Sequence, residues 1–169
     1  MAGNERLIKI FEHALQQEFT GREFFKTSLQ RMGWGSAVSA FRRLIAEEEK
    51  HIEMIEKILS GLKKGAPLDL PSSGASGEKA ANPFEERAKK EFLERCLEGS
   101  IVPEVTIFNT AWRIEKDLSE FYQKMAKQTE GKARKVLMYL SRWEQGHERL
   151  FREFHDKFDK MYSKIPWGG

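Results

Sequence analysis

The sequence predicts an all-α protein that folds as a four-helix bundle. Apolar residues recur at alternating intervals of three and four residues through four long stretches of the chain, which is the period of an amphipathic helix. The motif Glu-x-x-His occurs in the second stretch and again in the fourth, 96 residues later. The four stretches therefore form two similar helical hairpins.

The composition is that of one globular domain, which we expect to span residues 1–169. Hydrophobic residues at 40% and charged residues at 33% are typical of a helical protein with a single core. Lys and Arg (29) nearly balance Asp and Glu (26) and are spread along the chain, so we expect no binding to nucleic acid. The one cysteine, Cys96, excludes an intramolecular disulfide and a Cys-x-x-Cys motif.

We expect a cytoplasmic protein. Residues 1–10 contain no hydrophobic run long enough for a signal peptide. No stretch of the sequence approaches the ~20 apolar residues that a membrane helix requires, so no membrane association is expected.

The first helical hairpin is predicted over residues 4–62. Its two helices are separated by Gly-Trp-Gly at 33–35, and Ser36 is a typical N-cap for the second helix. Because the connection is short, the two helices are expected to be antiparallel neighbours.

Residues 63–101 differ in composition and are predicted to form a long crossover. This segment holds three of the five prolines and a run of serine, glycine and alanine at 72–77, which is typical of a loop. A brief amphipathic helix is expected around residues 85–97.

The second hairpin is predicted over residues 102–162. Its first helix opens near Pro103, a residue suited to the first helical turn. A turn at 129–131 leads into the last helix, which continues to about Tyr162. The tail at 163–169 contains proline and two terminal glycines and is not expected to be helical.

Each of the four predicted helices carries one glutamate near the middle of an otherwise apolar face. The two glutamates of the first hairpin are 30 residues apart in the sequence, and the two of the second hairpin are 29 residues apart. A carboxylate that is buried alone is costly, and four that converge also repel one another. Two divalent cations would balance four negative charges. The glutamates are Glu18, Glu48, Glu115 and Glu144.

Two of the four histidines, His51 and His147, follow a glutamate of this set by three residues. Residues three apart share a helical face, so each pair can direct a carboxylate and an imidazole at one point. Four carboxylates and two imidazoles are the ligand set of a bundle-core di-iron or di-manganese site, and the lack of thiolates argues against structural zinc. The predicted metal ligands are Glu18, Glu48, His51, Glu115, Glu144 and His147.

Several other residues near these positions are not expected to bind the metals directly. Tyr122 lies seven residues after Glu115 and is either a hydrogen-bond donor or radical relay beside the metals or, more simply, a core residue with a satisfied hydroxyl. Gly21 is expected to leave room for an oxidant. Six further residues are expected to be in solvent or on other helical faces: His13, His155, Glu47, Glu49, Trp112 and Trp143.

Two phrases of the sequence resemble the rubrerythrin-like branch of the ferritin-like di-iron carboxylate proteins. One is Ala-Glu-Glu-Glu-Lys-His at 46–51, and the other is Ile-Glu-Lys-Asp at 114–117 leading to Phe121 and Tyr122. The resemblance covers both hairpins but not the loop at 65–83. It implies a ferritin-like four-helix bundle in which the six predicted ligands hold two iron ions. The glutamates of the Glu-x-x-His motifs are expected to bridge or chelate these ions.

The resemblance also implies a function. An oxidoreductase that reduces hydrogen peroxide or dioxygen at a carboxylate-bridged di-iron site is expected, with manganese as the alternative metal. The single cysteine cannot supply a rubredoxin-like module, so the electron donor is expected to be a small molecule or a separate protein, such as a rubredoxin-like protein. A homodimer is expected because helix-bundle relatives commonly pair.

The sequence departs from the rubrerythrin pattern at one carboxylate. Family members usually carry a further glutamate three residues after the ligand on the third helix, and that position is Leu118 here. The corresponding position after Glu18 is Gly21. The movement of an iron towards such an extra carboxylate is therefore not implied for this chain.

Three other functions use the same sequence features. An iron-handling or storage protein would use the site as a ferroxidase entry point, and an oxygenase would use the same ligands on an organic substrate. A helical interaction module would carry a vestigial site. The tail at 163–169 shows no short fifth helix of the kind that ferritin cages use, which favours the oxidoreductase over storage.

Overall fold

The computed structural model describes residues 2–31, 36–68 and 105–162, and these residues form a helical bundle. They are 93% helical and contain no strand, which confirms the predicted all-α fold. The helices are α1 (Ala2–Arg31), α2 (Ser36–Lys63), α4 (Val105–Lys127) and α5 (Gly131–Tyr162).

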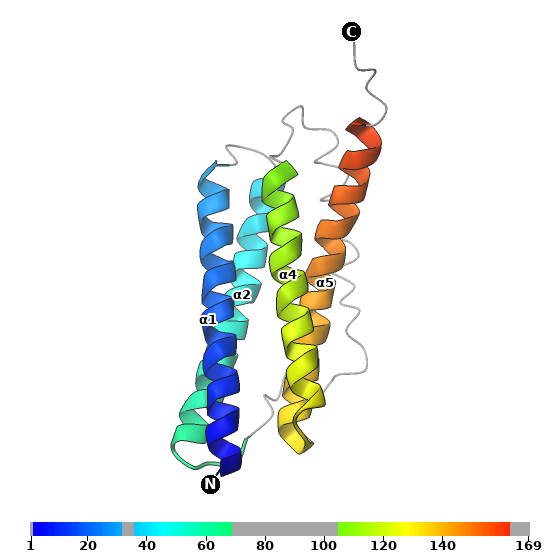
Figure 1. Cartoon of the computed structure of the whole chain (residues 1–169). Coiled ribbons are helices and arrows are strands. Elements are labelled where there is room, and N and C mark those ends of the chain that lie inside the picture. The colour runs from blue at the N-terminus through cyan, green and yellow to red at the C-terminus, as the bar shows by residue number, and fades with distance from the viewer. Residues whose placement is uncertain (1, 32–35, 69–104, 163–169) are drawn as a thin grey trace.

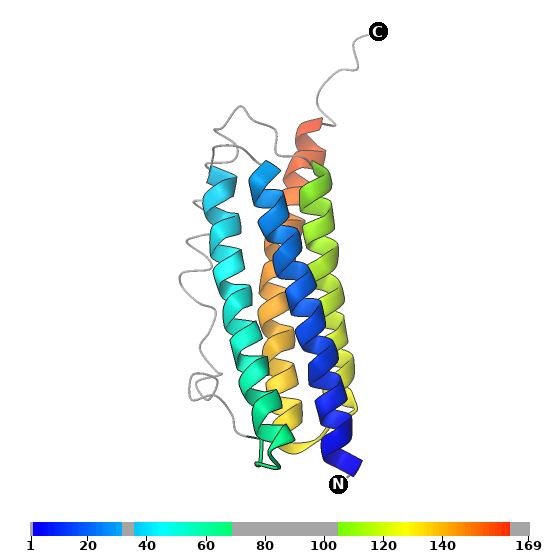
Figure 2. The ribbon, with the colours of Figure 1, turned by 90° about the vertical axis from the view of Figure 1, so that its left-hand side faces the viewer.

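The helices are arranged as two antiparallel hairpins, α1 with α2 and α4 with α5 (Figure 1). Helix α2 ends and α4 begins at opposite ends of the bundle, which is the arrangement that a long crossover produces. The view turned by 90° shows all four helices aligned with the long axis of the bundle (Figure 2). The prediction of a ferritin-like four-helix bundle is confirmed.

The helices are not equally close to one another. Their backbones approach most closely within each hairpin and between α1 and α4, whereas α2 and α5 lie further apart. At Gly21 of α1, a Cβ would make ordinary contacts with α4, at 3.4 Å from Ile114 Cγ2 and 3.9 Å from Leu118 Cδ1. Room for an oxidant beside Gly21 stays a prediction.

Apolar side chains fill the bundle in two clusters, one on each side of a polar layer. Along α1, Phe11 of one cluster comes before Glu18 and Phe25 of the other cluster comes after it. The same alternation of apolar cluster, polar layer and apolar cluster occurs on α2, α4 and α5. The layer with the predicted ligands is therefore sealed from both ends of the bundle.

Phenylalanine rings dominate one of the two clusters. Phe25, Phe41, Phe108 and Phe151 come from the four different helices and are at most 1% exposed. Their ring centroids lie 5.6 to 6.1 Å apart in edge-to-face, tilted and stacked pairs. Each buried ring contributes about 1.5–3 kcal/mol of hydrophobic stabilisation, so this cluster anchors all four helices beside the polar layer.

Some predicted features lie outside the described residues. These are the turn at 33–35, the short helix at 85–97 and the tail at 163–169. Within the described ranges, no helix is both long enough and apolar enough to cross a membrane.

Two glycines provide a test of the helix boundaries. Gly131 opens α5 with a φ of +59°, a left-handed conformation, so Gly131→Ala should lower the free energy of unfolding by about 1–2 kcal/mol. Gly61 lies within α2, and a Cβ there meets nothing within 4 Å. Gly61→Ala should therefore raise the free energy of unfolding by about 0.5–1 kcal/mol. Urea unfolding of the metal-free variants measures both, and effects of the same sign would contradict these boundaries.

Candidate metal centre

The six predicted ligands meet in one buried layer near the middle of the bundle. The four glutamates are 0% exposed, His51 is 1% exposed and His147 is 5% exposed. Every helix contributes to the layer: Glu18 from α1, Glu48 and His51 from α2, Glu115 from α4, and Glu144 and His147 from α5. Their places on the apolar faces bring these side chains to the interior, because the hydrophobic residues above and below them must be buried.

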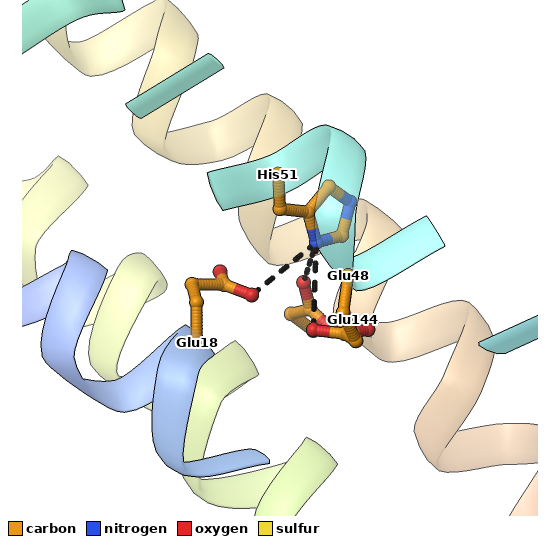
Figure 3. Close-up of side chains that lie close together, drawn as sticks. All are labelled: Glu18, Glu48, His51 and Glu144. Carbon is orange, nitrogen blue, oxygen red and sulfur yellow. Dashed lines mark ion pairs between the residues drawn. The ribbon is translucent and has the colours of Figure 1, made fainter. Parts of the chain in front are cut away.

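One group of ligand atoms surrounds the Nδ1 atom of His51 (Figure 3). This atom lies 2.8 Å from Glu144 Oε1, 3.5 Å from Glu18 Oε2 and 3.9 Å from Glu48 Oε2. Each of the four residues offers one ligand atom, and these atoms all lie within 4.8 Å of one another. We call this group the His51 position.

A second group, the His147 position, has the same composition. The Nδ1 atom of His147 lies 3.2 Å from Glu144 Oε2, 3.4 Å from Glu48 Oε1 and 3.4 Å from Glu115 Oε2. Here too, one ligand atom from each residue lies within 4.8 Å of the others. Glu48 and Glu144 belong to both groups and direct different oxygens towards each histidine, so they are placed to bridge two cations.

The donor atoms of this layer fit a pair of cations. Buried carboxylate oxygens that have no hydrogen-bond partner cost about 1–3 kcal/mol each, and a cation that accepts their lone pairs removes that cost. Oxygen and imidazole donors without thiolates suit iron or manganese. In the part of the chain that the structure describes, six such oxygens occur in this layer: Glu18 Oε2, both oxygens of Glu48, both oxygens of Glu115, and Glu144 Oε1.

Two of the glutamates hold protons more tightly than usual. Burial raises the pKa of Glu48, and the charges of Glu144 and Glu18 raise it further, to about 8. Burial and the charge of Glu48 likewise raise the pKa of Glu115 well above its usual range. Without a cation, protons therefore neutralise part of this layer at neutral pH.

The histidines and Glu144 respond to the same charges. Burial lowers the pKa of a histidine, but Glu144 and Glu18 beside His51 outweigh it, and that pKa is raised well above 6.5. Glu115 has the same effect on the pKa of His147. Burial raises the pKa of Glu144, but the two histidines that face it lower that pKa overall.

Tyr122 holds one of the ligands. Its ring is fully buried, and its hydroxyl donates a hydrogen bond to Glu18 Oε1. Burial and the nearby charge of Glu18 raise the pKa of Tyr122 well above 10, so the hydroxyl keeps its proton. Tyr122 is thus a core residue whose hydroxyl partner is a predicted ligand, and the bond leaves Glu18 Oε2 directed towards His51.

Glu47 lies beside the site, so the expectation that it points away is wrong. Its Oε2 lies 2.9 Å from His147 Nε2 and accepts a hydrogen bond from Trp143 Nε1 at 3.3 Å. Burial alone raises the pKa of Glu47, but the His147 and Trp143 hydrogen bonds and the charges of His147 and Arg43 lower it to about 2. Its sequence signal is its place next to Glu48, at the flank of the apolar face.

Trp143 also contacts the site, although we expected it on another face. Its ring packs edge-on against His51, with ring centroids 4.9 Å apart and an interplanar angle of 89°. Tyr139 packs against Trp143 at 5.4 Å, further along α5. Trp143 therefore shields His51 on the side where α2 and α5 lie apart.

The remaining interpretations concern surface residues. His13 and Glu49 are exposed, as expected. The side chain of His155 is only 27% exposed and its ring lies 5.4 Å from that of Trp112, so this histidine is partly buried. His13, Glu49 and His155 belong to neither ligand group.

The fold and the buried layer together define a class of protein: a ferritin-like helical bundle with a carboxylate and histidine cluster of the di-iron type. The rubrerythrin family model matches residues 9–155, which include all six predicted ligands. The chain therefore belongs to the rubrerythrin family. Comparisons with curated proteins and with solved structures gave no significant match.

The protonation of this layer predicts how stability depends on pH without metal. The pKa values of Glu48, Glu115, His51 and His147 are all raised in the folded protein. The folded protein thus binds more protons than the unfolded chain above about pH 4.5, and its free energy of unfolding falls as pH rises to about 8. The thermal unfolding midpoint of metal-free protein, measured between about pH 5 and 8, should fall steadily.

Metal binding and one variant provide controls for this prediction. A divalent cation replaces the bound protons, so the rise in midpoint that Mn²⁺ produces should increase over the same pH interval. Glu48→Gln should flatten the fall of the metal-free protein, whereas Glu49→Gln on the surface should not. A metal-free midpoint that rises with pH would contradict the assigned protonation.

Proposed function

We propose that this protein binds two iron ions through the six residues and reduces hydrogen peroxide or dioxygen with their electrons. The observation that carries the proposal is the pair of buried four-ligand groups that share Glu48 and Glu144. When bound, two ferrous ions supply the two electrons that convert hydrogen peroxide, with two protons, into two water molecules.

The chain's own residues have distinct roles in this proposal. Glu18 and His51 would hold one ion, Glu115 and His147 would hold the other, and the shared Glu48 and Glu144 would contribute to both. Four carboxylates balance the charge of two ferrous ions, and movement of the shared carboxylates can accommodate a change in metal charge.

The enclosure of the layer supports a small oxidant rather than an organic substrate. Its six residues are at most 5% exposed, and apolar clusters seal it on both sides. Peroxide and dioxygen are small enough to reach such a layer through transient openings. An organic substrate would need a pocket beside the layer, where Phe25, Phe41 and Ile114 pack instead. The low-dielectric surroundings also strengthen the attraction between the carboxylates and the cations.

The proposed reaction needs a source of electrons for repeated turnover. The chain has one cysteine and so lacks the four thiolates of a rubredoxin-like iron site. We propose a separate donor, either a rubredoxin-like protein or a small reductant.

An anaerobic titration of the metal-free protein with Fe²⁺ tests the site. Calorimetry should show two ions bound per chain. Glu48→Ala should lose both, because Glu48 belongs to both groups, whereas Glu115→Ala should lose only one. Glu49→Ala, an exposed neighbour on the same helix, is the matched control and should bind two. If Glu48→Ala still binds two ions, the six residues are not the site.

Stopped-flow mixing of the loaded protein with hydrogen peroxide then tests the reaction. We expect one peroxide consumed per two ferrous ions, with the iron retained by the chain, and repeated turnover when a reductant is added. Repeated oxidation of added Fe²⁺ with ferric iron accumulating well beyond two per chain would show iron storage instead.

A further inference from the structure

The residues that precede the two Glu-x-x-His motifs occupy equivalent places in the two hairpins but differ in chemistry. Glu47 precedes Glu48, and Trp143 precedes Glu144. Each reaches across to the histidine of the other hairpin, since Glu47 contacts His147 and Trp143 contacts His51. A symmetric arrangement of the backbone thus carries an asymmetric pair of side chains.

The imidazole of His147 is held at both of its nitrogens. Its Nδ1 faces the carboxylates of the His147 position, while its Nε2 lies 2.9 Å from Glu47 Oε2. When Nε2–H donates to Glu47, the lone pair of the neutral ring is on Nδ1, where a cation would accept it. Glu47 is itself held by hydrogen bonds from Trp143 Nε1 at 3.3 Å and Arg43 Nε at 3.4 Å.

The imidazole of His51 has no such partner. Its Nε2 is buried, and no hydrogen-bond acceptor among the described residues pairs with it. The Trp143 ring packs edge-on against it, so packing restrains the ring without a carboxylate to fix its tautomer. Among the residues that the structure describes, nothing near His51 does what Glu47 does for His147.

We infer that Glu47 is a positioning residue that makes the two metal positions unequal, so that the His147 position binds a divalent cation more tightly and fills first. The inference rests on the proposed six-ligand site. The two positions have the same kinds of ligand atom, because each combines one imidazole Nδ1 with three carboxylates and both share Glu48 and Glu144. Loss of a carboxylate partner of a metal-binding histidine typically costs 10–100-fold in metal affinity, so a difference of about tenfold or more is expected.

A second difference between the positions acts in the same direction. Tyr122 donates to Glu18 Oε1 and so occupies one oxygen of the His51 position. Glu115 is the corresponding ligand of the His147 position, and within residues 2–31, 36–68 and 105–162 neither of its oxygens has a hydrogen-bond partner, so both are available to a cation. The experiment must therefore separate the contribution of Glu47 from that of Tyr122.

Two-step binding by the unmodified chain is not enough to test the inference, because the first cation repels the second even at equal positions. Variants with one histidine removed isolate each position. His51→Ala retains the His147 position, and His147→Ala retains the His51 position. Anaerobic titration of these full-length, metal-free proteins with Co²⁺, followed by calorimetry and visible absorption, should give a Kd about tenfold lower or more for His51→Ala.

Glu47→Gln then assigns the difference. In the His51→Ala background it should raise the Kd about tenfold or more, and in the His147→Ala background it should change the Kd less than about threefold. Trp143→Phe keeps a ring against His51 but removes the donor to Glu47, so it should weaken binding only in the His51→Ala background. Glu49→Gln is the matched control in both backgrounds. Circular dichroism of each metal-free variant verifies that the helices are retained.

The outcomes separate failure of the inference from failure of the proposed site. If the unmodified chain binds no Co²⁺ and no Fe²⁺, the proposed site itself is overturned. If the chain binds two ions but both single-histidine variants bind equally, the inference is overturned and the site stands. If Glu47→Gln weakens both backgrounds equally, Glu47 has a general structural role, and the inference is also overturned.

Discussion

Four buried carboxylates in one layer are the constraint on which the rest of this structure depends. Their mutual repulsion and the loss of hydration oppose folding unless positive charge enters the layer. Protons supply part of that charge in the metal-free protein, as the raised pKa values of Glu48 and Glu115 indicate. Two divalent cations would supply all of it, and the two histidines are placed to bind them together with the carboxylates.

Apolar side chains pack on both sides of this layer, and their own burial stabilises the fold against the cost of enclosing the carboxylates. The phenylalanines of all four helices close one side, while aliphatic residues and Tyr122 close the other. The same enclosure that makes the carboxylates costly also strengthens their attraction for a cation, because the surroundings screen charge poorly. A well-packed core and a layer of side chains suited to cations are thus consequences of one arrangement. The more open side, between α2 and α5, is bridged by the contacts of Glu47 and Trp143.

The sequence predicted what depends on helical period and missed what depends on helix neighbours. The apolar intervals around Glu18 and Glu115 were sufficient to predict that these two residues are buried. The turn near Gly131 was predicted from the local composition. Glu47 and Trp143 lie at the flank of a face, where period alone does not decide between solvent and the adjacent helix. Their contacts with His147 and His51 depend on which helices are neighbours and how far apart they lie.

We propose that two metal ions lie between the six side chains of this layer. Crystals grown anaerobically with Fe²⁺, with diffraction measured on both sides of the iron absorption edge, test it most directly. We expect two separate anomalous peaks per chain, one beside the Nδ1 atom of His51 and one beside the Nδ1 atom of His147, with Glu48 and Glu144 in contact with both. A single peak, or peaks away from these carboxylates, would contradict it.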